Sequence, residues 1–184
     1  MKIAGYRAHM APGEYSGEPG TVYNYIMAGN GLFIESESEY LQARIQIAQV
    51  GIRGLVSLQE RVVLTNGRIP ATLFGQAMRL MELRLSEELY VAIVHRAGAY
   101  SLVVPGQDRG GAHVNYHRPA NTVLDIHSHP TFAGRFSGTD NSDEVGFQLY
   151  GVIGMLQTVS PQYTFRVGVY GHFKELKLQE VFGL

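Results

Sequence analysis

The sequence predicts an α+β fold, an α/β/α sandwich in which helices flank a mixed β-sheet, preceded by a small β-rich unit. Short apolar runs separated by glycine, proline and asparagine fill residues 20–65 and recur after residue 88, as expected of β-strands. Near Pro70, and again after Asp140, the apolar residues take the spacing of an amphipathic helix. Strands, helix, strands, helix and strands in this order are typical of a layered sandwich.

Residues 1–66 are expected to form the β-rich unit. The prolines and glycines within residues 1–20 predict an irregular lead-in. The runs Val22–Ala28 and Leu32–Glu35 then flank Gly29-Asn30-Gly31, and Asn-Gly between two apolar runs is a hairpin signal. Three further runs are predicted as strands: Ala43–Val50, Gly54–Leu58 and Val62–Leu64.

Residues 67–184 are expected to form a second domain that begins with a helix over residues 70–85. Pro70 suits a first helical turn, and apolar side chains from Leu73 to Leu85 recur at helical spacing. The strands predicted in this domain are Leu89–Val94, Ser101–Val104, His113–His117, Val123–His127, Tyr163–Tyr170 and Phe173–Leu178.

A second helix is predicted from Asp140 to Leu156. Its expected apolar face consists of Val145, Leu149, Val152, Ile153 and Leu156. This helix would begin directly after a loop over residues 131–137, so Asp140 would lie close to the end of the preceding strand.

The composition is that of an ordinary globular protein, with 184 residues of which 45% are hydrophobic and 17% charged. A formal net charge of −1 argues against nucleic acid as the main partner. The absence of cysteine excludes disulfides, cysteine-rich zinc modules and thiol catalysis. The first residues lack the apolar run of a signal peptide and no stretch is long enough to span a bilayer, so we expect a cytoplasmic protein without a membrane partner.

One stretch carries a pattern typical of metal sites: His127, His129, Ser137 and Asp140, spaced H-x-H-x7-S-x-x-D. Residues two apart on a strand point to the same face, so both imidazoles can aim at one point. Asp140 can return to the strand end from the next helix. Two histidines and one carboxylate are three ligands, and catalytic zinc typically has three protein ligands and one open position. The sequence therefore predicts a Zn²⁺ site held by His127, His129 and Asp140.

Other interpretations of the same residues stay open. Ser137 and Asp140 are also the pattern of a helix N-cap with its capping-box partner. Asp143 could orient a ligand, although an acidic residue is common at a helix N-terminus in any case. His113 and His117 share strand parity, but a solvated strand face explains them more simply than a second polar site.

The four-position motif resembles the signature of the JAMM (MPN+, JAB) metalloproteases, and the prokaryotic JAB-like members most of all. Residues 70–184 match the length and element order of that domain, in which a helix precedes a glutamate-bearing strand, the HxH strand and an aspartate-bearing helix. The segments Phe136–Gly154 and Arg166–Gly171, together with the N-terminal β unit, resemble the subgroup called PRTRC system protein A.

This resemblance implies a zinc-dependent metallopeptidase or isopeptidase and assigns two further catalytic residues. Ser137 would donate a hydrogen bond to the oxyanion. A glutamate at the start of the strand after the first helix would act as general base. Ser86-x-Glu88 fits the family spacing, but Val91 stands where the family usually has glycine, so Glu87 is a rival of Glu88.

The resemblance also implies partners. The substrate would be the C-terminal tail of a ubiquitin-like or sulfur-carrier-like protein or conjugate, and an E1-like (ThiF-related) protein would be a functional neighbour. Two alternatives are a non-catalytic MPN-type interaction module and a zinc hydrolase of a small amide. Scaffolding members of the family typically lose the metal ligands, whereas this sequence keeps all of them.

Overall fold

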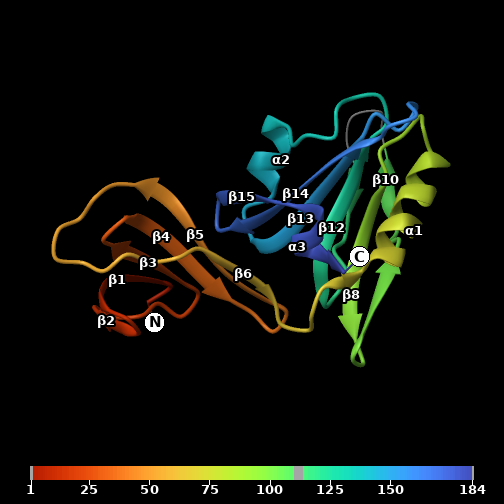
Figure 1. Ribbon diagram of the computed structural model, residues 1–184. Helices are drawn as coiled ribbons and strands as arrows, with labels where there is room; N and C mark the ends of the chain where they lie inside the picture. The colour runs from red at the N-terminus through yellow and green to blue at the C-terminus, as the bar shows by residue number, and fades with distance from the viewer. Residues whose placement is uncertain (1, 110–113, 184) are drawn as a thin grey trace. The chain divides into compact units, whose positions relative to one another are not determined.

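The computed structural model describes residues 2–109 and 114–183 (Figure 1). The chain folds into two compact units: Met1–Thr65 with His172–Lys174, and Asn66–Gly171 with Glu175–Leu184. We call them unit 1 and unit 2. That they are independent domains stays a prediction. Within the described residues, no helix combines the length and apolar character needed to cross a membrane.

Unit 1 contains a six-stranded sheet with the order β2-β1-β3-β4-β5-β6. The strands are β1 (Ala4–Ala11), β2 (Glu14–Ser16), β3 (Tyr23–Ala28), β4 (Gly31–Glu37), β5 (Leu41–Gln49) and β6 (Arg61–Leu64). β1 and β3 are parallel, and the other neighbours are antiparallel. The hairpin predicted around Asn30 is confirmed, because β3 and β4 pair from Ala28↔Gly31 to Tyr23↔Ser36.

Two predictions for unit 1 are wrong. Residues 1–20 are not an irregular lead-in, because β1 and β2 occupy most of them. Gly54–Leu58 is not a strand. Leu58 instead packs with the buried residues Ile26, Ala28 and Phe33, so this segment contributes one buried side chain to the core from a loop.

A second six-stranded sheet has the order β15-β14-β13-β12-β8-β9 and belongs to unit 2, except for His172–Lys174 of β15, which are grouped with unit 1. These strands are β8 (Tyr90–Arg96), β9 (Ala99–Val103), β12 (Thr122–His129), β13 (Phe147–Gly154), β14 (Gln162–Val169) and β15 (His172–Leu176). Two smaller pairs, β7 (Ile69–Pro70) with β16 (Phe182–Gly183) and β10 (Gln107–Arg109) with β11 (Val114–Tyr116), complete the strands of this unit among the described residues. β12 and β13 are parallel at the centre of the sheet.

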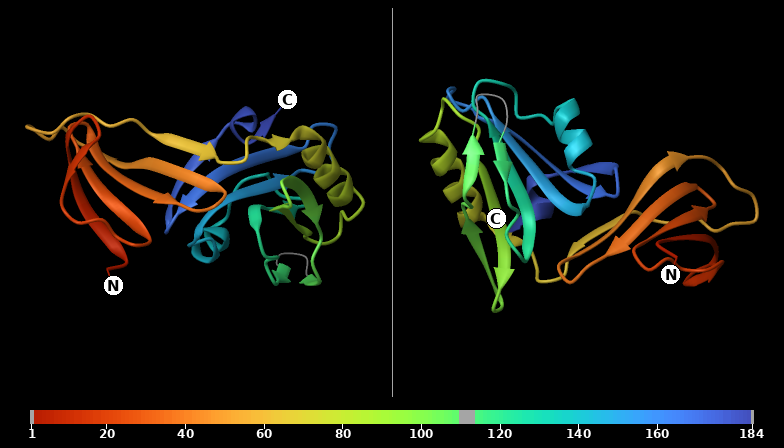
Figure 2. Two further views of the ribbon diagram at one scale, coloured as in Figure 1. Left: turned by 90° about the horizontal axis from the view of Figure 1, so that it is seen from below. Right: turned by 180° about the vertical axis from the view of Figure 1, so that it is seen from behind.

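The helices of the described residues are α1 (Ala71–Glu82), α2 (Gly138–Asp143) and α3 (Leu178–Val181). α1 covers one face of the unit 2 sheet. Its Phe74 ring contacts Phe165 of β14 and Phe182 of β16 at centroid distances of 5.8 and 5.2 Å. Figures 1 and 2 show α2 on the opposite side of the sheet from α1.

The predicted α+β fold, an α/β/α sandwich, is wrong, because the protein is mostly β and the helices of the described residues span only twelve, six and four residues. The error lies in the second helix. The predicted helix from Asp140 to Leu156 is in fact α2 followed by the buried strand β13. β13 is buried on both faces, as central strands are, so its apolar residues do not alternate with exposed polar ones and also fit a helical period.

Candidate metal centre

Strand β12 brings His127 and His129 to the face of the sheet opposite α1. Directly opposite residues of neighbouring strands share a face, and His127 lies opposite Tyr90 of β8 and Val152 of β13. β12 ends at His129. Ser128, between the two histidines, is fully buried, and its hydroxyl accepts a hydrogen bond from the Leu89 amide at 2.9 Å. Ser128 therefore ties the start of β8 to the histidine strand.

The loop after β12 returns the chain to this face. The Phe132 carbonyl accepts a hydrogen bond from the Met155 amide at 2.7 Å, and the Gly134 carbonyl accepts one from the Thr164 hydroxyl at 2.6 Å. A Cβ atom at Gly134 would lie 2.3 Å from the Gln162 carbonyl oxygen, so only glycine fits this approach. These contacts fix the loop against the ends of β13 and β14 and determine where α2 begins.

Ser137 is the N-cap of α2, and it forms a capping box with Asp140. Its Oγ accepts from the Asp140 amide at 3.1 Å, while its own amide donates to Asp140 Oδ2. The capping-box interpretation of this pair is therefore confirmed. The Ser137 side chain is exposed, and the cap uses its oxygen as acceptor, so its hydroxyl proton is not consumed by this bond.

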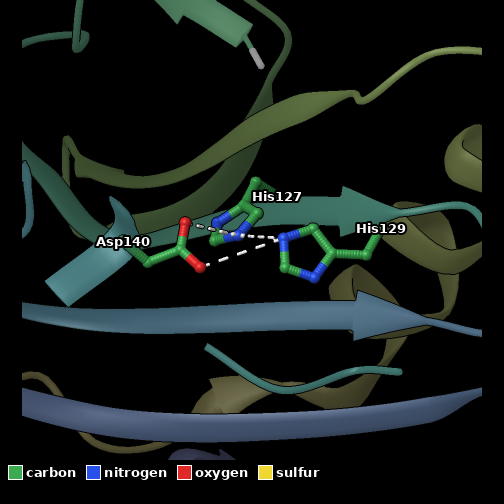
Figure 3. A group of neighbouring side chains, drawn as sticks. All are labelled: His127, His129 and Asp140. Carbon is green, nitrogen blue, oxygen red and sulfur yellow. Dashed lines mark hydrogen bonds and ion pairs between the residues drawn. The ribbon is translucent and has the colours of Figure 1, made fainter. Parts of the chain in front are cut away.

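The three predicted ligands converge on one point, as Figure 3 shows. The Nε2 atoms of His127 and His129 are 3.2 Å apart. Asp140 Oδ1 lies 3.3 Å from His127 Nε2, and Asp140 Oδ2 lies 3.9 Å from His129 Nε2. Ligand atoms bound tetrahedrally to zinc at 2.0–2.1 Å are about 3.3 Å from one another. Two of the three distances are close to this value and the third is longer, so the three side chains form a group that could hold a metal ion.

The second nitrogen of each imidazole faces an acceptor. His129 Nδ1 is 3.4 Å from the Ala133 carbonyl oxygen, and His127 Nδ1 is 3.9 Å from Glu144 Oε1. The Ala133 carbonyl is within hydrogen-bond distance and favours the His129 tautomer with the proton on Nδ1, whereas Glu144 acts on His127 through its charge. The two Nε2 atoms at the shared point are therefore better placed to bind a cation than to hydrogen-bond to each other.

The charges of the cluster shift its pKa values. Burial would lower the pKa of His127, but the hydrogen bond and charge of Asp140 outweigh burial and raise it. Burial and the neighbouring His127 together lower the pKa of His129. Burial would raise the pKa of Asp140, yet its bonds to His127 and Ser137 hold it well below its usual range. In the metal-free protein, Asp140 therefore favours its ionised form and stabilises a proton on His127.

Glu144 and Arg166 support the centre, although the sequence analysis missed both. Arg166 of β14 donates from Nε and Nη2 to Glu144 Oε2 at 3.0 and 2.6 Å, which leaves Oε1 facing His127. Arg166 also donates to Asn141 Oδ1 and lies 3.7 Å from the Phe136 ring centroid. One buried arginine thus connects β14, the loop before α2, and the carboxylate beside His127. An arginine between the apolar residues Phe165 and Val167 of β14 was the available signal.

Asp143, the residue considered for an orienting role, is exposed, and it is Glu144 that faces His127. His113 lies outside the described residues, and His117 is exposed.

The two candidate bases are placed differently. The Glu88 side chain is buried, with Oε1 3.9 Å from His129 Nε2. Glu87 is exposed. The geometry brings Glu88 beside the three ligands.

A buried polar cluster lies next to the ligands on the same face. Asp125, two residues before His127, accepts a hydrogen bond from the Tyr90 hydroxyl at 2.5 Å and pairs with Arg118 at 2.6 Å. The rings of Tyr90 and Tyr116 stack with centroids 3.3 Å apart. Burial and the Asp125 charge raise the pKa of Tyr90 far above its ordinary value, so its hydroxyl stays protonated and donates. This cluster holds β12 against β8 and β11.

No model of a known protein family matches the chain, and a search of curated proteins likewise finds no significant match. The motif and the geometry of the site therefore carry the argument about function.

Proposed function

We propose that this protein is a zinc-dependent hydrolase of the JAMM metalloprotease type. One observation carries the proposal: His127, His129 and Asp140 bring three ligand atoms within 4.8 Å of one another, and the buried carboxylate of Glu88 is 3.9 Å from one of them. Three protein ligands with a nearby carboxylate are the arrangement of hydrolytic zinc sites.

His127 Nε2, His129 Nε2 and an Asp140 carboxylate oxygen would hold the ion. When bound, zinc would act as a Lewis acid that polarises the scissile carbonyl and makes water more acidic.

Glu88 and Ser137 would perform the proton and charge steps. Glu88 accepts a proton from the attacking water and delivers it to the leaving amine. The Ser137 hydroxyl donates a hydrogen bond to the oxygen on which negative charge develops. The cap supports this second role, because it holds the Ser137 oxygen and leaves the hydroxyl proton available.

The proposed substrate is the C-terminal tail of a ubiquitin-like or sulfur-carrier-like protein, with an E1-like protein as functional neighbour in the cytoplasm. This part rests on the resemblance of the motif. The non-catalytic module is disfavoured because the chain keeps all three ligands and the buried glutamate. A hydrolase of a small amide would share the metal centre and differ only in substrate.

The zinc content of the purified protein tests the ligand set. Purified protein should contain about one zinc per chain by elemental analysis, and the His127→Ala/His129→Ala double variant should contain none.

The decisive experiment compares two glutamate variants. Glu88→Gln should retain zinc and lose turnover of a ubiquitin-like fusion by roughly 10²–10⁴-fold, the usual range for a general base. Glu87→Gln is the matched control and should be near neutral.

Three outcomes would contradict the proposal. Full zinc content in the double histidine variant would exclude the ligand set. Full activity of Glu88→Gln together with loss in Glu87→Gln would exclude the assigned base. Stoichiometric zinc without cleavage of any tail fusion or small amide would favour the interaction module.

A further inference from the structure

Unit 1 contains a polar hollow that the proposed hydrolase site does not use. Its volume is about 450 Å³, and residues 7–61 alone line it. The hollow lies over a row of directly opposite residues that crosses five neighbouring strands. The row is Gly5, Asn24, Glu35, Arg44 and Arg61. Opposite residues point to one face of a sheet, so their side chains gather on the same side.

Two arginines of the hollow have no acidic partner among the described residues. Arg44 is paired, because its guanidinium donates to Glu35 Oε2. Arg7 instead stacks on the Tyr15 ring at 4.2 Å, and its buried Nε has no hydrogen-bond partner in the described part of the chain. Arg61 is exposed and forms no ion pair with any residue that the structure describes. Because the Nε of Arg7 is closed to solvent, a ligand in the hollow would meet the outer nitrogens of the Arg7 guanidinium, since Arg7 lines the hollow.

Close packing at one wall of the hollow holds a further hydrogen-bond donor in place, the side-chain amide of Asn24. Asn24 Oδ1 accepts a hydrogen bond from the Gly20 amide at 2.8 Å. A Cβ atom at Gly5 would lie 2.2 Å from that same oxygen, so only glycine permits this placement. Because the oxygen is occupied, the Asn24 amide presents its NH₂ group as the remaining donor.

The charges indicate which kind of ligand the hollow would accept. Its arginines are Arg7, Arg44 and Arg61, and its acidic residues are Glu35 and Glu37, which leaves an excess of one positive charge. One excess charge suits a single carboxylate better than a doubly charged phosphate. Glu37 is exposed and can accept a hydrogen bond from a donor group on the same ligand. The volume falls within the range of small-ligand pockets and exceeds what one carboxylate group fills.

We propose that this hollow binds a small polar carboxylate that also carries a hydrogen-bond donor, either a free amino acid or the C-terminus of a peptide. The carboxylate would take its hydrogen bonds from Arg7 and the Asn24 amide, with Arg61 at the opposite side. Guanidinium groups are the preferred partners of carboxylates because they donate two parallel hydrogen bonds.

Nuclear magnetic resonance on the full chain, labelled with ¹⁵N, tests this proposal. The probes are the tripeptide Gly-Ser-Gly with a free C-terminal carboxylate, the same tripeptide as its C-terminal amide, and free serine. We expect the free tripeptide or serine to shift the Arg7 Nε–H resonance saturably, with a Kd on the order of 1 mM. The amidated tripeptide should bind at least about tenfold more weakly, since it lacks the charge-assisted bonds. Binding of serine as tight as that of the tripeptide identifies a free amino acid as the source, and binding of the tripeptide alone identifies a peptide end.

Variants separate the hollow from the rest of the surface. Arg7→Gln and Arg61→Gln should each weaken binding about tenfold, and Arg61 is exposed, so its replacement should leave the fold intact. Arg53→Gln is the matched control, because Arg53 is exposed in the same unit and does not line the hollow. Equal binding of the amide and the free acid, or no saturable shift with either carboxylate, would overturn the proposal. The His127→Ala/His129→Ala variant should bind the probes normally, so failure of the hydrolase proposal would leave this result unchanged.

Discussion

At the scale of single residues, both nitrogens of His127 have an assigned neighbour. Nε2 faces the ligand point and Nδ1 faces Glu144, whose other oxygen is held by Arg166. A carboxylate behind a metal-binding imidazole fixes its tautomer and raises its basicity, and losing such a partner typically costs 10–100-fold in metal affinity. Glu144 is therefore a positioning residue for the proposed centre.

Glu144→Ala should weaken zinc binding about 10–100-fold in a chelator competition assay, and Glu144→Gln should weaken it less because an acceptor oxygen remains. Imidazole ¹⁵N shifts of the metal-free protein, recorded at a pH at which His127 is neutral, provide a second readout: the Nδ1–H tautomer of His127 should lose population in the alanine variant. Asp143→Asn, an adjacent exposed acid, is the control. Unchanged affinity and tautomer in Glu144→Ala would exclude the role.

The His127–Asp140 pair predicts that the stability of the metal-free protein and the affinity for zinc change in opposite directions with pH. The raised pKa of His127 stabilises the fold below about pH 6.5, and this contribution is lost as pH rises through the shifted value. The lowered pKa of Asp140 stabilises the fold above about pH 4, and this contribution is lost as pH falls. The ion pair therefore contributes fully to stability between about pH 4 and about pH 6.5. Zinc needs neutral histidine, so its affinity should rise over the range in which the pair is lost.

Urea unfolding with a chelator present, between pH 5.5 and 8.5, tests this window. Above about pH 6.5, where the opposing contribution of the lowered His129 pKa is complete, the free energy of unfolding should decline as pH rises in the native sequence. The decline should be shallower in Asp140→Asn, which lacks the charge that holds the His127 proton. Parallel curves for the two proteins would show that the pair does not couple to stability.

At the scale of single elements, α2 depends on Ser137, which is both its cap and the proposed oxyanion donor. The two roles can be separated, because glycine at an N-cap costs only a few tenths of a kcal/mol whereas alanine costs about 1 kcal/mol. Ser137→Ala should lose both stability and turnover. Ser137→Gly should lose a similar factor in turnover with little loss in unfolding free energy. Full turnover in Ser137→Gly would leave the hydroxyl with the capping role alone.

Strand β13 and helix α1 offer a matched pair of glycines. A Cβ atom at Gly151 would lie 2.6 Å from the Phe165 ring, whereas one at Gly75 within α1 would meet nothing within 4 Å. Gly151→Ala should therefore destabilise the protein by about 1–3 kcal/mol through overpacking. Gly75→Ala should stabilise it by up to about 1 kcal/mol, the helix preference of alanine over glycine. Denaturant unfolding of both variants measures the contrast, and a neutral Gly151→Ala would mean that β13 can shift away from β14.

At the scale of the whole molecule, the sequence predicted local features better than layers. The hairpin at Asn30 depends on adjacent residues, and the metal motif depends on strand parity and a short return loop, so both could be predicted. The strand β13 could not be told from a helix, because burial on both faces removes the alternation that distinguishes a strand. Glu144 and Arg166 meet across 22 positions of sequence, and nothing local marks such a pair.

The whole-molecule prediction concerns unit 2. All residues of the proposed centre, from Glu88 to Arg166, lie within Asn66–Gly171. If the centre is complete in unit 2, a fragment of residues 66–184 should bind about one zinc with an affinity within roughly twofold of the full chain, since groups without shared contacts act additively. Chelator competition measures this affinity, and circular dichroism reports whether the fragment folds. The fragment should also lose binding of the free tripeptide, because the polar hollow belongs to unit 1. A folded fragment that has lost zinc would show that the centre needs residues 1–65, and an unfolded fragment would show that the two units are one cooperative structure.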